Sequence, residues 1–414
     1  MKALVKTKPP ESGRWPEGLS LVERPVPDLS SPTDILVKVT AGGICGTDVG
    51  IYHSKDSLRT SMSRIAEEGV ITGHEFCGRV ADAGPRAAAI LAKKVLAKYS
   101  SDRKLGKFLG KKTPATLARG GGFLDFLREK FIVTAEMHIT CGACAQCKLG
   151  EYHVCTNTVI RGLHADGAFA PYVALPAENI VLVRKGEIPE EIVAFMDAIG
   201  NATHTVQSLS SVKGKSVAVL GAGVIGLMSV AIARGAGAKT IFVTDASHGR
   251  NTHEKLVKRR FKVARALGAD ECFDVSLTAG KEQFYRAAKS RNHGAGVDAV
   301  LEMSGSYRAY EDAFHVLRMG GEISLLGLTA GTIPLDFSKN VIFPGITIHG
   351  IIGRRVWSTW DMMTDLLRNG LARKFQEAGF VTHEFPLADY RKGFEAIDDG
   401  DALKVLLRPD PSKE

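Results

Sequence analysis

Residues 216–245 read SVAVLGAGVIGLMSVAIARGAGAKTIFVTD and decide the fold of the central part of the chain. A short apolar run precedes a glycine turn, an apolar stretch of helical length follows, and a second strand-like run ends at Asp245. Strand, helix and strand in this order form a βαβ unit. The helix-like KRRFKVARALGA (258–269) and the strand-like AVLEMSG (299–305) continue the alternation. The pattern predicts an open, doubly wound parallel sheet of the α/β class.

The glycine turn carries the pattern of a dinucleotide-binding loop. Gly221, Gly223 and Gly226 form G-x-G-x-x-G directly after the strand, and Val224 and Ile225 open the helix. The first glycine permits a tight turn, the second lets the backbone approach the pyrophosphate, and the third lets the helix pack on the strand. Free N–H groups at the helix start would bind the phosphates.

The second strand indicates which nicotinamide cofactor is preferred. Asp245 can bind both ribose hydroxyls of NAD and repel the 2′-phosphate of NADP, so NAD is expected. NADP stays an alternative because five basic residues follow closely and could neutralise that phosphate. They are Arg250, Lys255, Lys258, Arg259 and Arg260.

Four of the seven cysteines lie within 15 positions, as Cys141, Cys144, Cys147 and Cys155. Four thiolates at these spacings can surround a tetrahedral Zn²⁺ and leave no position for substrate. The pattern predicts a structural zinc, with an iron–sulfur cluster or two disulfides as the alternatives.

A second metal site is expected from separate loops. Cys45 lies in GGICGTD (42–48), and His74 and Glu75 lie in GHEFCG (73–78). A thiolate, an imidazole and a carboxylate suit a zinc that keeps one position open for water or substrate.

These segments occur in a familiar order. GGICGTD, GHE, the cysteine loop and GAGVIG (221–226) resemble the zinc-dependent medium-chain dehydrogenases of the alcohol dehydrogenase superfamily. Further stretches, such as DAIGNATHT (197–205) and VIFPGITIHGIIGR (341–354), are similar to L-threonine 3-dehydrogenases within it. The resemblance covers nearly the whole chain except residues 86–130 and about 246–256.

The resemblance implies two domains and two zinc ions per chain. A GroES-like, β-rich catalytic domain is expected over residues 1–185 and 356–414, and a Rossmann domain over 186–355. The expected activity is hydride transfer from a secondary alcohol to NAD. A polyol, sugar or modified-sugar dehydrogenase is one alternative, and a non-catalytic scaffold protein is another. A homo-oligomer, tetramer or dimer, is also implied.

Single residues acquire expected roles through the same resemblance. Asp197 is a further zinc ligand or a proton-relay group, Thr47 supplies the first hydroxyl of the relay, and His138 helps to select the substrate. The remaining expected cofactor contacts are Leu326, Gly327 and Arg354, the last near the nicotinamide and its phosphates.

One position departs from the pattern. L-threonine 3-dehydrogenases have a histidine three residues after the relay threonine, and this chain has Gly50. His53 is a candidate substitute in the relay, and a larger substrate using the vacated space is an alternative.

The net charge of +9 is confined to one segment. Residues 86–130 hold 12 Lys and Arg against 3 Asp and Glu, which leaves the rest of the chain balanced. Within this insertion Ala87–Tyr99 suggests a short amphipathic helix, and the glycine- and lysine-rich continuation suggests an exposed segment. It is a candidate docking patch for an anionic partner, although a solvated decoration or an oligomer contact is the simpler interpretation. No nucleic-acid-reading motif is present.

The start of the chain and its hydropathy indicate the compartment. Residues 1–18 contain charge and proline in place of an apolar signal core, and no stretch reaches about 18 apolar residues. A cytoplasmic protein without transmembrane segments is therefore expected.

Overall fold

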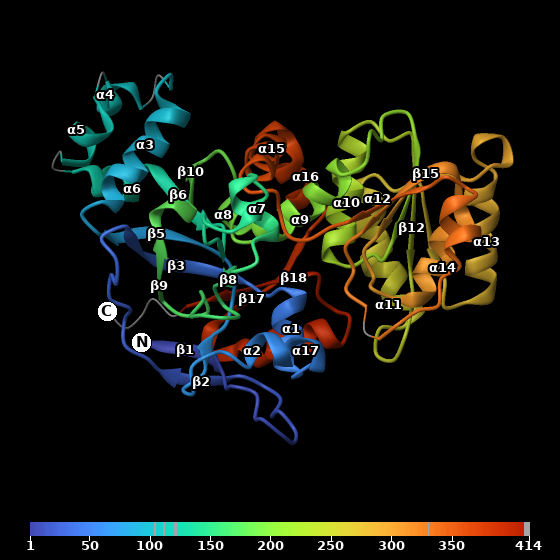
Figure 1. The fold of residues 1–414 in the computed structure, drawn as a ribbon, viewed down its shortest axis with the longest axis horizontal. Helices are drawn as coiled ribbons and strands as arrows, with labels where there is room; N and C mark the ends of the chain where they lie inside the picture. The colour runs from blue at the N-terminus through green and yellow to red at the C-terminus, as the bar shows by residue number, and fades with distance from the viewer. Residues whose placement is uncertain (103–104, 111, 120–121, 330, 410–414) are drawn as a thin grey trace.

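The computed structural model describes residues 1–102, 105–110, 112–119, 122–329 and 331–409. Two large β-sheets organise these residues and lie side by side in Figure 1.

The sheet on the right of Figure 1 is entirely parallel and uses the middle of the chain. Its order is β13–β12–β11–β14–β15–β16, which is the 3-2-1-4-5-6 order of doubly wound dinucleotide-binding folds. The predicted fold class is thus confirmed. The strands are β11 (Ser216–Leu220), β12 (Thr240–Asp245), β13 (Glu271–Asp274), β14 (Val297–Glu302), β15 (Leu317–Leu325) and β16 (Thr347–Gly350).

Helices cover both faces of this sheet, which explains why its inner strands are apolar on both sides. Every residue of β11 is buried. One face packs against α10 (Val224–Gly235) and α12 (Lys262–Leu267), and the other against α13 (Thr278–Lys289) and α14 (Tyr307–Val316) (Figure 1).

The second sheet combines strands from both ends of the chain. Its order is β10–β6–β5–β3–β18–β17, with β9 also paired to β3. The C-terminal β18 pairs with the N-terminal β3, so the chain returns to its first sheet after completing the parallel one. The strands are β3 (Asp34–Gly43), β5 (Glu75–Ala83), β6 (Phe131–Ala135), β9 (Tyr172–Pro176), β10 (Ile180–Arg184), β17 (Val381–Pro386) and β18 (Lys404–Arg408). A three-stranded sheet, β2–β1–β4, accompanies it, with β1 (Lys2–Lys6), β2 (Ser20–Glu23) and β4 (Val70–Ile71).

Several helices carry or support the candidate site. They are α1 (Gly46–Tyr52), α2 (Asp56–Met62), α7 (Ala145–Lys148), α8 (Glu190–Val193), α9 (Met196–Gln207), α15 (Ser358–Leu366), α16 (Ala372–Glu377) and α17 (Tyr390–Asp398). Residues 55–69, although mostly polar, include α2, whose Met62 is fully buried. None of the described helices combines the length and apolarity that a membrane crossing needs.

The basic insertion is a small helical layer on the second sheet. Its helices are α3 (Ala87–Tyr99), α4 (Gly106–Leu109), α5 (Pro114–Arg119) and α6 (Phe123–Lys130). The predicted helix over 87–99 is confirmed. The continuation was expected to be exposed, but where it is described Leu105, Leu109 and Leu117 are buried. Residues 103–104, 111 and 120–121 of that segment lie outside the described residues.

The insertion lies far from the parallel sheet and next to β6 and β10 (Figure 1). Its Lys94 Nζ donates to the carbonyl oxygens of Glu178 and Ile180, the latter at 2.8 Å, and lies 4.7 Å from the ring centre of Trp357. The segment therefore braces the protein next to α15 and does not cover the glycine turn.

Candidate active site

The glycine turn connects β11 to the first residue of α10. Gly221 has φ +108°, a conformation that L side chains rarely adopt. A Cβ on Gly226 would lie 1.9 Å from the Gly221 carbonyl oxygen, whereas a Cβ on Gly223 would meet nothing within 4 Å. Each glycine is therefore required for a different purpose. Gly221 makes the turn, Gly226 allows the helix to pack closely, and Gly223 leaves the backbone surface open. Val224 and Ile225 follow in the first turn of α10.

A cavity of about 580 Å³ opens beside this turn. Gly221, Asp245, Ser247, Ser276 and Ser304 are among its lining residues. Asp245 ends β12, accepts a hydrogen bond from the backbone N–H of Ala246, and pairs with Arg260 at 2.8 Å. The cavity has the position and the acidic group that a dinucleotide ribose requires.

Leu326 and Gly327 directly follow β15 and are not among the residues that line this cavity. A Cβ at Gly327 would lie 2.1 Å from the backbone nitrogen of Gly305, so the neighbouring loop requires a glycine there. Their contact with a cofactor stays a prediction.

Cys45, His74 and Glu75 meet at one end of the second sheet, where Gly43 at the end of β3 pairs with Glu75 at the start of β5. Cys45 caps α1, and Glu75 begins β5. One potential ligand atom from each residue lies within 4.8 Å of the other two. The structure therefore brings together the three side chains that the sequence placed about 30 residues apart.

The surrounding charges support these three side chains. Asp48 accepts the backbone N–H of Cys45 at 2.9 Å, and its second oxygen lies 3.5 Å from His74 Nδ1. Lys404 Nζ pairs with Glu75 Oε2 at 2.6 Å, and both side chains are almost fully buried. Burial alone would lower the pKa of Lys404, but the charges of Glu75 and Cys45 raise it, so the ammonium stays charged.

The donor set fits a metal ion. Glu75 Oε1 and Asp197 Oδ1 are buried, and neither has a hydrogen-bond partner in the part of the chain that the structure describes. Unpaired buried carboxylate oxygens are costly unless a cation satisfies them. A thiol, an imidazole and these oxygens are the ligand types of a catalytic zinc.

Asp197 and Arg354 form an ion pair, and Asp197 also groups with Glu136 and His138 as possible metal ligands. Burial, and with it the charge of Asp197, raises the pKa of Glu75, so these two carboxylates are neighbours. Arg354 Nη1 lies 2.7 Å from Asp197 Oδ2, and the Arg354 side chain is 1% exposed. Its other nitrogens bind Glu136, so the guanidinium points into the protein. Its N–H groups are taken by buried protein acceptors, and its expected place near the nicotinamide and its phosphates stays a prediction.

The expected relay residues are dispersed. Thr47 is half-buried in the first turn of α1, close in sequence to Cys45. His53 instead pairs with Asp398 of α17 at 3.0 Å, so a carboxylate outside the metal cluster holds its ring. A Cβ on Gly50 would lie 2.9 Å from Leu58 Cδ1 of α2. Leu58 therefore packs against Gly50, and a larger substrate that uses the space of the missing histidine stays a prediction.

His138 lies next to Asp197 and Glu136. One ring nitrogen is 2.8 Å from Glu136 Oε1 and 2.7 Å from Arg354 Nη2, and the side chain is partly exposed. That nitrogen can donate to the carboxylate or accept from the guanidinium, but not both.

The four cysteines of residues 141–155 form a separate centre around α7. The sulfur of Cys155 lies 3.6 Å from that of Cys141 and 3.9 Å from that of Cys144. Sulfurs about 2.3 Å from a tetrahedral zinc would be about 3.8 Å apart, while a disulfide needs about 2.05 Å. All four cysteines are unpaired, and their separations favour a shared metal ion over disulfides. Backbone N–H groups of Cys147 and Thr156 lower the pKa of Cys144 to about 6, which favours the thiolate.

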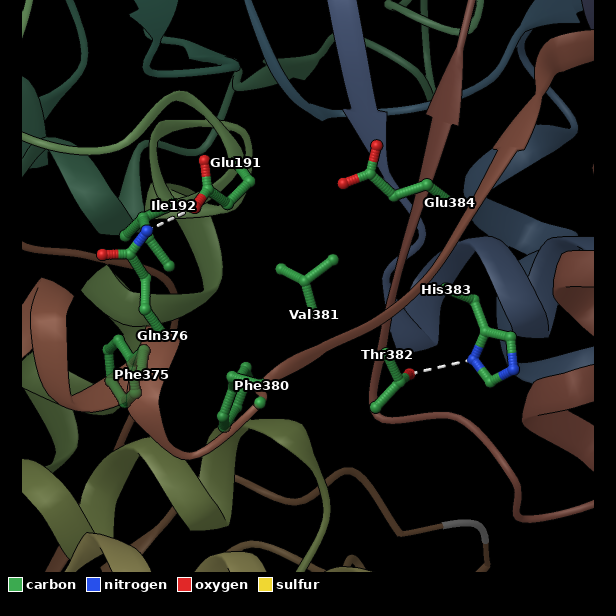
Figure 2. Close-up of a pocket in the computed structure, with 10 residues that line it drawn as sticks. Glu191, Ile192, Phe375, Gln376, Phe380, Val381, Thr382, His383 and Glu384 are labelled. Carbon is green, nitrogen blue, oxygen red and sulfur yellow. Dashed lines mark hydrogen bonds between the residues drawn. The ribbon is translucent and has the colours of Figure 1, made fainter.

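A second hollow of about 350 Å³ lies beside β17 and α16 (Figure 2). Its carboxylates have partners: Glu191 accepts from Gln376 at 2.6 Å, and Glu384 pairs with Arg408 at 2.8 Å. Residues of the Cys45 cluster and of the glycine turn do not line this hollow. We therefore do not assign it a role in the reaction.

Three supporting residues escaped sequence reasoning. Lys404 and Glu136 are charged residues inside apolar runs, KVLLR and FIVTAEM, and that contrast was the available signal. Asp48 belonged to the quoted GGICGTD, but its role depends on a fold that brings His74 beside it.

Comparisons with known proteins agree with this geometry. A family model described as Zinc-binding dehydrogenase matches residues 224–369, and one described as Alcohol dehydrogenase GroES-like domain matches 31–127 and 129–185. The L-threonine 3-dehydrogenase of Caldanaerobacter subterraneus is 35% identical over 393 residues, 95% of this chain and 96% of that protein. That of an Anaeromyxobacter species is 34% identical over 407 residues, 98% of each. The solved alcohol dehydrogenase of Thermus sp. ATN1 has a TM-score of 0.72 at 25% identity and covers 99% of this chain and 100% of that one.

Proposed function

Because this chain belongs to the zinc-dependent alcohol dehydrogenase family and is a nicotinamide-linked oxidoreductase, we propose that it oxidises an amino alcohol of the L-threonine type with NAD. The observation that carries the proposal is the cluster of Cys45, His74 and Glu75 with a buried, unpartnered carboxylate oxygen. A scaffold protein has no need of such a site. A polyol or sugar substrate is the alternative within the family.

The protein's own share of the reaction is orientation and proton removal. When bound, a zinc at Cys45, His74 and Glu75 would supply Lewis acidity, and the nicotinamide would supply the hydride acceptor. Asp48 orients His74, and Lys404 holds one oxygen of Glu75. Thr47 is the proposed first group to receive the substrate's hydroxyl proton. His53 is left out of this relay because Asp398 holds its ring.

The substrate proposal is tested by comparing kcat/KM for L-threonine, a secondary alcohol without an amino group, and a polyol. We expect the highest value for L-threonine, because two L-threonine 3-dehydrogenases are 34% and 35% identical to this chain over 98% and 95% of its length. A polyol that exceeds L-threonine would reject the amino-alcohol proposal and leave the oxidoreductase chemistry standing.

The preference for NAD rests on the ion pairs that occupy the basic residues following Asp245. All five basic residues that argued for NADP have acidic partners, and none lines the cavity beside the glycine turn. The pairs are Arg250–Asp399, Lys255–Asp401, Lys258–Glu254, Arg259–Asp401 and Arg260–Asp245. Arg260 partly neutralises Asp245. Because its guanidinium is held in this pair, it is not free to bind a 2′-phosphate.

Replacing Asp245 with serine should shift the preference toward NADP. The change removes a charge that repels the 2′-phosphate and frees Arg260 to attract it. The ratio of kcat/KM for NADP to that for NAD should rise roughly 30-fold, which corresponds to a change of about 2 kcal/mol in relative transition-state free energy. Asp270→Ser, which breaks a similar pair with Arg234 outside the cavity, is the control and should leave the ratio unchanged. An unchanged ratio in Asp245→Ser would reject the role assigned to this carboxylate.

Further features of the proposal concern stoichiometry and assembly. Two zinc ions per chain are proposed, one at Cys45, His74 and Glu75 and one at the four cysteines. A third donor group, Glu136, His138 and Asp197, is assigned no ion of its own because Arg354 occupies both oxygens of Glu136. A homo-oligomer is proposed because large apolar side chains are exposed around the edge strand β16 of the parallel sheet. They are Met319, Leu328, Phe337, Ile342, Phe343 and Ile352. An anionic partner for the insertion and a cytoplasmic location stay predictions.

A further inference from the structure

A buried polar network lies beside the proposed zinc ligands and includes groups that the chemistry above does not use. Its centre is Glu136, which is fully buried two residues before His138. A buried carboxylate is tolerated only when its oxygens are satisfied, so its partners indicate its role.

Both oxygens of Glu136 are fully engaged. Oε2 accepts from Arg354 Nε at 2.8 Å and from the indole N–H of Trp360 at 2.7 Å. Oε1 accepts from Arg354 Nη2 at 2.5 Å and from the backbone N–H of His138 at 3.0 Å. Glu136 therefore holds Arg354 by a two-pronged contact, which fixes the plane of the guanidinium. Glu136, His138 and Asp197 lie close enough together to hold a metal ion themselves, but both oxygens of Glu136 already have donors.

The opposite edge of the guanidinium rests on α9. Arg354 Nη1 contacts Asp197 Oδ2 at 2.7 Å and donates to Asn201 Oδ1 at 3.1 Å. Asp197, Gly200 and Asn201 are spaced i, i+3 and i+4, so they share one face of the helix. A Cβ on Gly200 would lie 2.4 Å from Arg354 Cδ. The glycine thus makes room for the arginine stem to cross the helix.

The result is an asymmetric Asp197 carboxylate. Oδ2 is held by Arg354, while Oδ1 is buried and has no hydrogen-bond partner among the described residues. We propose that Glu136 is a positioning residue that locks Arg354, and that Arg354 in turn fixes Asp197 so that its free oxygen is offered to the zinc of Cys45, His74 and Glu75. This inference rests on the proposed function, because it presumes a metal ion at that cluster.

Partners of this kind orient metal ligands, and their loss typically weakens metal binding by about 10- to 100-fold. Glu136→Gln keeps the shape but loses the charge that fixes Arg354. We expect its catalytic site to bind zinc about 10- to 100-fold more weakly in competition with a chelator. With Co²⁺ in that site, we also expect the visible absorption spectrum to change, because a ligand has moved.

The controls separate positioning from general damage. Glu187→Gln removes a carboxylate from another arginine, Arg368, and should change neither the affinity nor the spectrum. In an Asp197→Asn background, Glu136→Gln should have little further effect, because its influence passes through Asp197. If Glu136→Gln does not fold, Arg354→Lys, which keeps the charge but loses the fork, must show the same shifts.

Three negative outcomes can be told apart. If the unaltered protein binds no metal at the Cys45 cluster, the proposed function fails. If it binds metal and a folded Glu136→Gln variant has the same affinity and the same Co²⁺ spectrum, the positioning role is overturned. A full effect of Glu136→Gln in the Asp197→Asn background would overturn the route through Asp197.

Discussion

Replacement of Cys45 by serine is expected to abolish alcohol oxidation while the protein stays folded. The thiolate is one of the three donors that cluster at this site, so its loss removes the Lewis acid that the reaction needs. Losing about 4 kcal/mol of transition-state stabilisation would lower kcat/KM by about 1000-fold. Steady-state kinetics and metal analysis on the same preparation measure this, and zinc should fall from two ions to one per chain.

The matched control is Cys272→Ser. Cys272 is a half-buried thiol on β13 and belongs to none of the three groups of possible metal ligands found in the described part of the chain. We expect unchanged zinc content and nearly unchanged kinetics. Retention of two zinc ions by Cys45→Ser, or of activity within about tenfold of the unaltered protein, would contradict the assignment of Cys45.

Replacement of Lys404 by methionine should give the second large effect, on stability. Lys404 and Glu75 are 2.6 Å apart with side chains 1% and 0% exposed. Removing one partner of a buried pair leaves an uncompensated charge and typically costs about 3–5 kcal/mol. The free energy of unfolding, measured by urea denaturation at fixed zinc concentration, should fall by this amount.

An exposed ion pair at the start of α17 provides the comparison. Lys392 pairs with Asp389 at 3.1 Å, and its side chain is 61% exposed. Lys392→Met should therefore change stability by less than about 1 kcal/mol. If both variants lost the same free energy of unfolding, the claim that the buried pair stabilises the protein more than the exposed one would be wrong.

Local motifs made much of this protein predictable from its sequence. The glycine turn and the four-cysteine loop each lie within about 15 residues, so their geometry follows from short segments. Cys45, His74 and Glu75 were predictable as a set because their residue types are zinc ligands and their order resembles a known family.

Long-range pairs were beyond the sequence. Glu136 and Arg354 are 218 residues apart, and Glu75 and Lys404 are 329 apart. No local pattern encodes such contacts, which depend on the C-terminal strand β18 returning to the first sheet. The same limit hid the buried partners of Arg354, Glu136 and Asp197.

Composition was misleading where short helices bury few residues. The lysine- and glycine-rich part of the insertion suggested exposure, yet Leu105 and Leu109, spaced i and i+4, are buried. Its neighbour Phe108 stacks on Phe126 with ring centres 4.0 Å apart. The apolar spacing was a better guide than the charge.

The most direct test is reduction of the nicotinamide cofactor by alcohols. The zinc-loaded protein should produce reduced NAD, followed by its absorbance, from at least one of L-threonine, other amino alcohols, polyols and sugars. The signal should disappear in Cys45→Ser. If a protein carrying two zinc ions reduces neither NAD nor NADP with any alcohol of this panel, the account of the site is contradicted.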